Sequence, residues 1–318
     1  MFPRSILCFL LILFLAACES LVTDVDQGNL PQVESKLVVQ CFISPQSARI
    51  NAIVTESVPL FAEPDLKGGV IPNAVVKLSD GSREAVIPFD TTNQLYSVDK
   101  AVLPILPGKT YFLSVTDGVR SVSASCTVPL SAVVPKAYEI DTTASGDISA
   151  RDTTLTVKYT WADIAGQTNY YRIRASLDLE YSVPEGVTNE GKIIEKRVRN
   201  RFNFNWDDTI GRNDFRNDVN LDGTDFHSPI GRVRLPNPLA YTAGNGTTYL
   251  SFPKSKIVSV TMEVYNTDEH YFKYHRSVQT RGDSDNPFVE PSLIYTNVEG
   301  GLGCFASYNS GQFIYRPK

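Results

Sequence analysis

The segment from Asp218 to Asp225 carries side-chain oxygens at spacings that suit a calcium ion. Asp218, Asn220 and Asp222 alternate along the chain, Gly223 follows them, and Asp225 comes next among the acidic residues. Alternate side chains converge on one ion when a loop curls, and the glycine permits the sharp turn that brings a backbone carbonyl into the shell. The sequence therefore predicts calcium ligands at Asp218, Asn220, Asp222 and Asp225.

The second half of this loop departs from an EF-hand. Pro229 occupies the position where a bidentate glutamate belongs, and no helix is predicted on either side. Asp207, Asp208 and Asp214 are near enough in sequence to complete an ion shell of another geometry. The alternative interpretation is an acidic surface loop with an Asp-Gly turn and no ion.

Arginines and histidines give two weaker signals. Arg197, Arg199 and Arg201 alternate along one predicted strand. Such a row either grips an acidic partner or lipid A phosphates, or is a solvated face balanced by carboxylates, and the second reading is favoured. His270 and His275 do not share a helix face well, so packing or solvent contact is expected for both, not metal binding.

Signals of catalysis are missing. The sequence has no serine elbow, no phosphate-binding loop and no His-Glu-x-x-His zinc pair, and it holds only 3 histidines. The carboxylates of glycoside hydrolases are brought together by folding and need no fixed spacing. We therefore expect a protein that is not an enzyme and has no cofactor beyond the calcium hypothesis; a carboxylate-dependent surface hydrolase is the least favoured alternative.

The first residues carry a lipoprotein signal. An apolar run after Arg4 is too short to cross a bilayer, and it ends in Leu15-Ala16-Ala17-Cys18, with small residues before the cysteine. Residues 1–17 are expected to be removed as a signal peptide, Cys18 to become the lipidated N-terminus, and residues 18–34 to form a tether. Because no second apolar stretch approaches spanning length, the protein is expected to be anchored to a membrane by lipid.

Three cysteines are left once Cys8 is cleaved away and Cys18 is acylated, namely Cys41, Cys126 and Cys304. Strand phase places Cys41 and Cys126 on inward faces, so they can meet in one core. A Cys41–Cys126 disulfide and a pair of buried free thiols both stay open, because an oxidising envelope permits the bond without requiring it. Cys304 is the odd thiol and is expected to be buried.

Short alternating runs with Asp-Gly turns dominate the chain, so the fold class is predicted to be mainly β, with two antiparallel β-sandwich domains. Residues 35–131 are predicted to form an immunoglobulin-like β-sandwich, and residues 132–153 a connector. The strands of the sandwich are predicted at 36–43, 48–56, 73–79, 84–89, 95–98, 110–116 and 119–128. Residues 154–318 are predicted to form a second β domain with one helix near 268–279. The formal charge of −5 argues against nucleic acid as a partner.

Some elements of the second domain are predicted in detail. Thr267 is expected to cap the helix, and Tyr271, Tyr274 and Val278 to form its buried stripe. The last strands are expected at 293–298, 304–308 and 312–316.

A motif near the C-terminus is recognisable. Residues 285–291 read Asp-Asn-Pro-Phe-Val-Glu-Pro, and residues 295–305 read Tyr-Thr-Asn-Val-Glu-Gly-Gly-Leu-Gly-Cys-Phe. With the lipobox, the Pro-Gly-Lys-Thr-Tyr corner at 107–111 and Trp-Ala-Asp at 161–163, this motif resembles a Bacteroidota outer-membrane lipoprotein family catalogued as domain of unknown function 4249. The resemblance covers nearly the whole mature chain.

The resemblance implies an outer-membrane accessory whose gene lies beside that of a TonB-dependent transporter, and it brings no catalytic residues. The leading hypothesis is a non-catalytic, lipid-anchored protein that docks on the transporter β-barrel or captures its cargo. An envelope scaffold or adhesin-like binding module without a transporter partner is the alternative. Whether the body faces the periplasm or the cell surface stays open.

Overall fold

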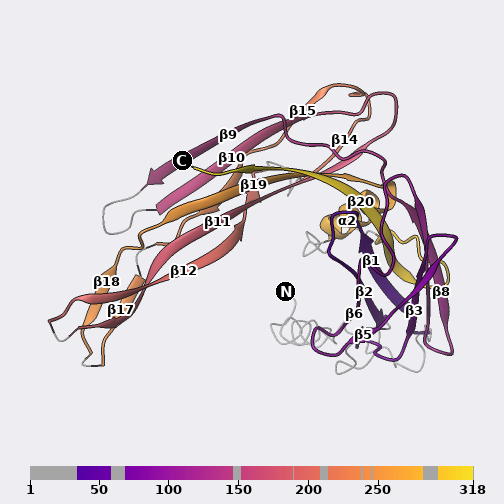
Figure 1. Ribbon diagram of the computed structural model, residues 1–318, viewed down its shortest axis with the longest axis horizontal. Coiled ribbons are helices and arrows are strands. Elements are labelled where there is room, and N and C mark those ends of the chain that lie inside the picture. Colours follow the sequence, from indigo (N-terminus) through magenta and orange to yellow (C-terminus); the bar gives the residue numbers. More distant parts are fainter. Residues whose placement is uncertain are drawn as a thin grey trace, which may run out of the picture. The chain divides into compact units, whose positions relative to one another are not determined.

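The period-two patterns of the sequence form β-strands in the computed structural model of the protein (Figure 1). The structure describes residues 34–58, 69–145, 152–188, 190–207, 214–237, 239–244, 246–281 and 293–317. The predicted signal peptide, Cys18 and most of the predicted tether lie outside the described residues. The fold is mainly β with several antiparallel sheets, and one compact unit comprises Lys36–Glu56 and Gly69–Lys318.

The strands before residue 130 form two sheets that share one hydrophobic core. Alternate residues point inward because successive side chains of a strand lie on opposite faces, so Leu37, Val39 and Cys41 are fully buried between partly exposed neighbours. The predicted strands of this part are confirmed, and the short β5 adds to them. One sheet holds β1 (Leu37–Ile43), β2 (Arg49–Glu56), β5 (Phe89–Asp90) and β6 (Leu95–Asp99), and the other holds β3 (Val75–Ser79), β4 (Glu84–Ile87), β7 (Thr110–Thr116) and β8 (Ser121–Thr127).

A second core lies between long strands and a smaller sheet. Trp161, Tyr159 and Ile173 are among its fully buried side chains. The long strands are β11 (Tyr170–Val187), β12 (Ile193–Asn203) and β19 (Lys256–Thr267), joined by β14 (Phe215–Asn217). The smaller sheet holds β9 (Ala137–Ser145), β10 (Asp152–Ala162), β13 (Asn205–Trp206), β15 (Asp225–His227) and β16 (Gly231–Arg234), and β17 (Leu239–Thr242) pairs with β18 (Thr248–Ser251).

The last strand, β20 (Leu302–Tyr315), connects both cores. It pairs with β19 in antiparallel fashion and with β1 in parallel, which joins nine strands in one sheet (Figure 1). Phe305 near its start belongs to the first core, whereas Phe313 and Tyr315 near its end pack against the second. The two predicted β domains, residues 35–131 and 154–318, therefore contribute strands to the same sheet.

Two local predictions of strands are wrong. The strands expected at 304–308 and 312–316 are one strand, because the polar break at Ser310 and Gly311 continues the pairing with β19 and makes no turn. Residues 293–298 form no strand; the Asn297 side chain instead bonds the backbone N–H and C=O of Phe305, at 3.0 and 2.7 Å. The connector contains β9, whose backbone groups are satisfied by pairing with β10 despite its polar side chains.

The predicted helix is confirmed as α2 (Glu269–Arg281), but its cap differs from the prediction. Asp268 caps it, since its Oδ1 accepts the Tyr271 backbone N–H at 2.7 Å, whereas Thr267 ends β19 and donates its hydroxyl to the Tyr170 carbonyl. Tyr271 and Tyr274 are buried as expected, and Val278 is 40% exposed because the stripe ends before it.

Candidate functional site

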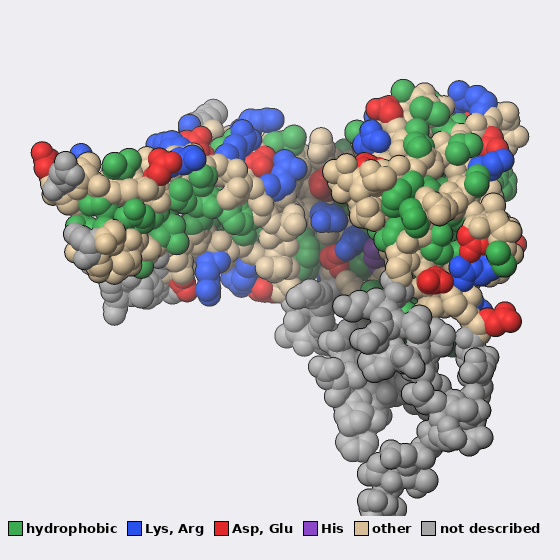
Figure 2. All heavy atoms as spheres, turned by 90° about the horizontal axis from the view of Figure 1, so that it is seen from below, with side chains coloured by type: hydrophobic (Ala, Val, Ile, Leu, Met, Phe, Trp, Pro, Cys, Tyr) green, Lys and Arg blue, Asp and Glu red, His purple; other side chains and the backbone are tan. Residues whose placement is uncertain are grey.

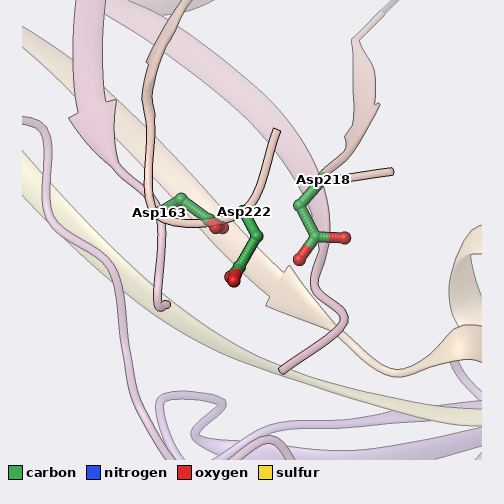
Figure 3. A group of neighbouring side chains, drawn as sticks. All are labelled: Asp163, Asp218 and Asp222. Atoms are coloured by element: carbon green, nitrogen blue, oxygen red, sulfur yellow. The ribbon is translucent and has the colours of Figure 1, made fainter. Parts of the chain in front are cut away.

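Three aspartates meet where the loops after β10 and β14 approach each other (Figure 3). Asp163 follows β10, Asp218 follows β14, and Asp222 lies in the turn between β14 and β15. One carboxylate oxygen from each lies within 4.8 Å of the others. Asp218 is buried, Asp163 is half-buried and Asp222 is exposed, so the cluster opens to solvent on one side.

Each carboxylate of this cluster already accepts hydrogen bonds from the protein. Asp163 accepts from the Tyr171 hydroxyl at 2.6 Å and from the Gly223 N–H at 2.8 Å. Asp222 accepts from the N–H of Gly166, also at 2.8 Å. These bonds tie the loop after β10 to the loop after β14.

Asp218 makes the most enclosed of these bonds. Its Oδ2 accepts from the backbone N–H of Asn169 at 2.8 Å and from the Asn169 side-chain amide at 3.3 Å. Carboxylates keep further lone pairs beyond these bonds, and hard oxygen ligands are what a calcium ion takes. The arrangement therefore holds the loops together and offers carboxylate oxygens to a divalent cation.

The structure rearranges the predicted ligand set. Asp218 and Asp222 come together as predicted, whereas Asp225 forms an ion pair with Lys136. Asn220 occupies the left-handed region at φ 64°. Asp163 is the member that the spacing did not reveal, because it is distant in sequence. Its signals in the sequence are its place directly after an alternating strand and its place in the Trp-Ala-Asp motif at 161–163.

The other acidic residues considered as ligands have different partners. Asp207 accepts from Arg232 at 2.6 Å, and Asp214 accepts from Arg172 and Gln279, both at 2.8 Å. Asp208 lies outside the described residues. The predicted alternative shell around Asp207 and Asp214 is therefore not assembled among the described residues.

The arginine row of β12 is balanced by carboxylates of the neighbouring strand β11. Arg197 bonds Glu180, while Arg199 and Arg201 approach Asp178, with Arg201 making two contacts of 3.1 Å. The hydrogen bond from Arg201 is the main cause that lowers the pKa of Asp178. The favoured interpretation of a balanced, solvated strand face is confirmed.

Both helix histidines take part in packing. His270 Nδ1 lies 2.7 Å from the Tyr295 hydroxyl oxygen. His275 packs its ring against Phe42 and Phe215, with centroids 5.0 and 5.9 Å apart, and burial is the main cause that lowers its pKa to about 3. A neutral, enclosed imidazole fits the expected packing role.

Asp268 is a buried carboxyl that fastens α2 to β20. Its Oδ2 accepts from the N–H and from the hydroxyl of Ser307, each at 2.7 Å. Burial raises its pKa to about 6, against the opposing effect of these bonds. The Asp268 carboxyl is enclosed, and its bonds link α2 to β20. This suits a structural role and not that of an acid or base that contacts a substrate.

Cys41 and Cys126 both lie in the first core, as strand phase predicted, and both are free thiols in this structure, as is Cys304. The disulfide considered as one alternative is not formed here. A buried thiol packs like a small apolar side chain, so sharing a core requires no bond. Burial raises the pKa of Cys41 to about 12, which makes the thiolate form negligible.

No helix among the described residues combines the length and apolar character that crossing a membrane requires. A model of the family described as Domain of unknown function (DUF4249) matches residues 19–314 of the chain. No curated protein matches the chain.

Proposed function

From the premise that this chain belongs to the family described as Domain of unknown function (DUF4249), we propose that it is a non-catalytic, lipid-anchored outer-membrane protein. In this proposal it docks on a TonB-dependent transporter or captures the cargo of that transporter. The lipobox ending at Cys18 motivates the anchor. The residues between Cys18 and Leu37, fully extended, span at most ~60 Å, so the body can stand over a neighbouring β-barrel.

A group of exposed apolar side chains supports docking over catalysis. Ile194 of β12, Leu250 of β18 and Phe252 just after it are 46%, 47% and 50% exposed. Figure 2 shows a band of hydrophobic side chains over the part of the molecule that contains β12, β17 and β18, with basic and acidic side chains beside it. Exposed apolar surface rimmed by polar groups is typical of a protein interaction site.

Ion pairs border these apolar side chains. Lys254 approaches Glu195 to 3.2 Å, and Lys196 approaches Glu185 to 3.8 Å. Such exposed pairs contribute little to stability, but they favour one orientation of a partner over others. Exposed apolar side chains with ion pairs near them in this part of the molecule are the observation on which the proposed function rests.

The test is a tagged pull-down from native outer membranes in mild detergent, scored by mass spectrometry. We expect one transporter β-barrel at near-equal abundance with the wild type, and its loss with Phe252→Glu. Val119→Glu, at a position 93% exposed in the turn before β8, is the matched control and should retain the barrel. A wild-type protein that recovers no stoichiometric barrel would favour the scaffold or adhesin-like alternative.

A further inference from the structure

The outer face of the β4-β3-β7-β8 sheet holds a groove, whose lining also includes His270 and Asn297 described above. Its volume is about 560 Å³, within the range of small-ligand sites. Strand register sets Ser79, Phe112 and Ser125 in one row across the sheet, and Ser114 and Ser123 in the next row. These five side chains form the floor of the groove.

The floor combines one aromatic ring with small hydroxyl side chains. Phe112 is 50% exposed on a strand whose next residue, Leu113, is buried, so its outward position follows from strand alternation. Among the described residues, the hydroxyls of Ser114 and Ser125 have no hydrogen-bond partner. Both remain available to a ligand, and their small size lets it approach the sheet closely.

Charged groups lie at the two ends of the groove. Lys77 and Glu84 form a 2.8 Å ion pair at the β4 end. At the β8 end, Glu299 is held by two backbone bonds to Ser123, of 2.8 and 3.2 Å, and its carboxylate lies 3.5 Å from the Ser123 hydroxyl. A balanced pair at one end and a lone carboxylate at the other disfavour an anionic ligand.

We propose that this groove binds a neutral oligosaccharide. A sugar ring offers an apolar C–H face, which fits the exposed Phe112 ring, and hydroxyls that both donate and accept, which fit Ser114, Ser125 and Glu299. The four strands lie about 4.8 Å apart, so the groove runs for ~14 Å, the extent of a short chain and not of a single sugar. The proposal requires neither a membrane nor a transporter.

The experiment is calorimetric titration of the purified full chain, in a detergent without a sugar headgroup. The probes are maltohexaose, cellohexaose, laminarihexaose, xylohexaose and mannohexaose, with dextran sulfate as the anionic probe. We expect at least one neutral probe to bind, and Phe112→Ala to weaken that binding about tenfold. Leu106→Ala is the matched control, because Leu106 is an apolar side chain of similar exposure, 48%, outside the groove lining, and it should bind like the wild type.

Ser114→Ala tests the hydroxyl separately, because alanine keeps the Cβ and removes only the hydroxyl group; we expect weaker binding. The proposal is overturned if no neutral probe binds at millimolar concentration, if only dextran sulfate binds, or if Phe112→Ala binds like the wild type. Because the pull-down described above reports on the transporter alone, failure of the saccharide proposal and failure of the docking proposal are distinguishable.

Discussion

Gly303→Ala is expected to separate the two strands that join the cores. Gly303 lies on β20 opposite Val39 of β1, with φ +107°, a conformation that residues with a side chain rarely adopt. A Cβ at this position would lie 2.0 Å from the Val39 carbonyl oxygen, which is backbone and cannot swing away. The strands must therefore move apart before an alanine fits.

The loss of unfolding free energy expected for Gly303→Ala has two parts. Backbone strain at positive φ costs about 1–3 kcal/mol. The Cβ–O separation must also grow from 2.0 Å to about 3.4 Å, which stretches the neighbouring β1–β20 hydrogen bonds beyond their working range. Each lost bond costs about 1 kcal/mol, and several are affected, so the total loss of unfolding free energy should reach at least ~4 kcal/mol.

Gly118→Ala separates the strain from the clash. Gly118 also has a positive φ, +92°, but nothing lies within 4 Å of an added Cβ, so alanine there should cost only the strain. By urea unfolding followed with circular dichroism, Gly118→Ala should lose ~1–3 kcal/mol. Gly303→Ala should lose at least ~4 kcal/mol, or not accumulate as folded protein while Gly118→Ala does. Equal losses in the two variants would refute the close approach of β20 to β1.

Three further results are expected. Because the pKa of Asp268 is raised to about 6, its protonated form favours the folded state: this stabilisation is present at acid pH and lost as pH rises through about 6. Wild type should therefore lose ~2 kcal/mol of unfolding free energy relative to Asp268→Asn between pH 4 and pH 7 in urea unfolding; parallel pH profiles would contradict this. Millimolar calcium should raise the melting temperature of wild type but not of Asp222→Asn, and an unmoved wild type would remove the ion hypothesis. The Cys18→Ala protein should appear in the soluble fraction and not in the membrane pellet. If it pellets with membranes like the wild type, the result would count against the lipid anchor.

The sequence by itself determined the local elements of this protein. Strict alternation of apolar and polar residues predicted the strands before residue 130 nearly to the residue, because a period of two can be recognised from neighbouring positions alone. The stripe that contains Tyr271 and Tyr274 likewise predicted α2. The spacing also predicted that the carboxylates of Asp218 and Asp222 lie close together.

Only the tertiary structure decided what distant segments do to one another. Asp163 lies close to Asp218 because the loops after β10 and β14 converge. Asp225 lies on β15, where its carboxylate forms an ion pair with Lys136. The pairing of β20 with β1 depends on partners at opposite ends of the chain, and no local period encodes such a pairing. Packing between distant strands and loops, which glycines such as Gly303 permit, is the physical reason why these features appear only in the fold.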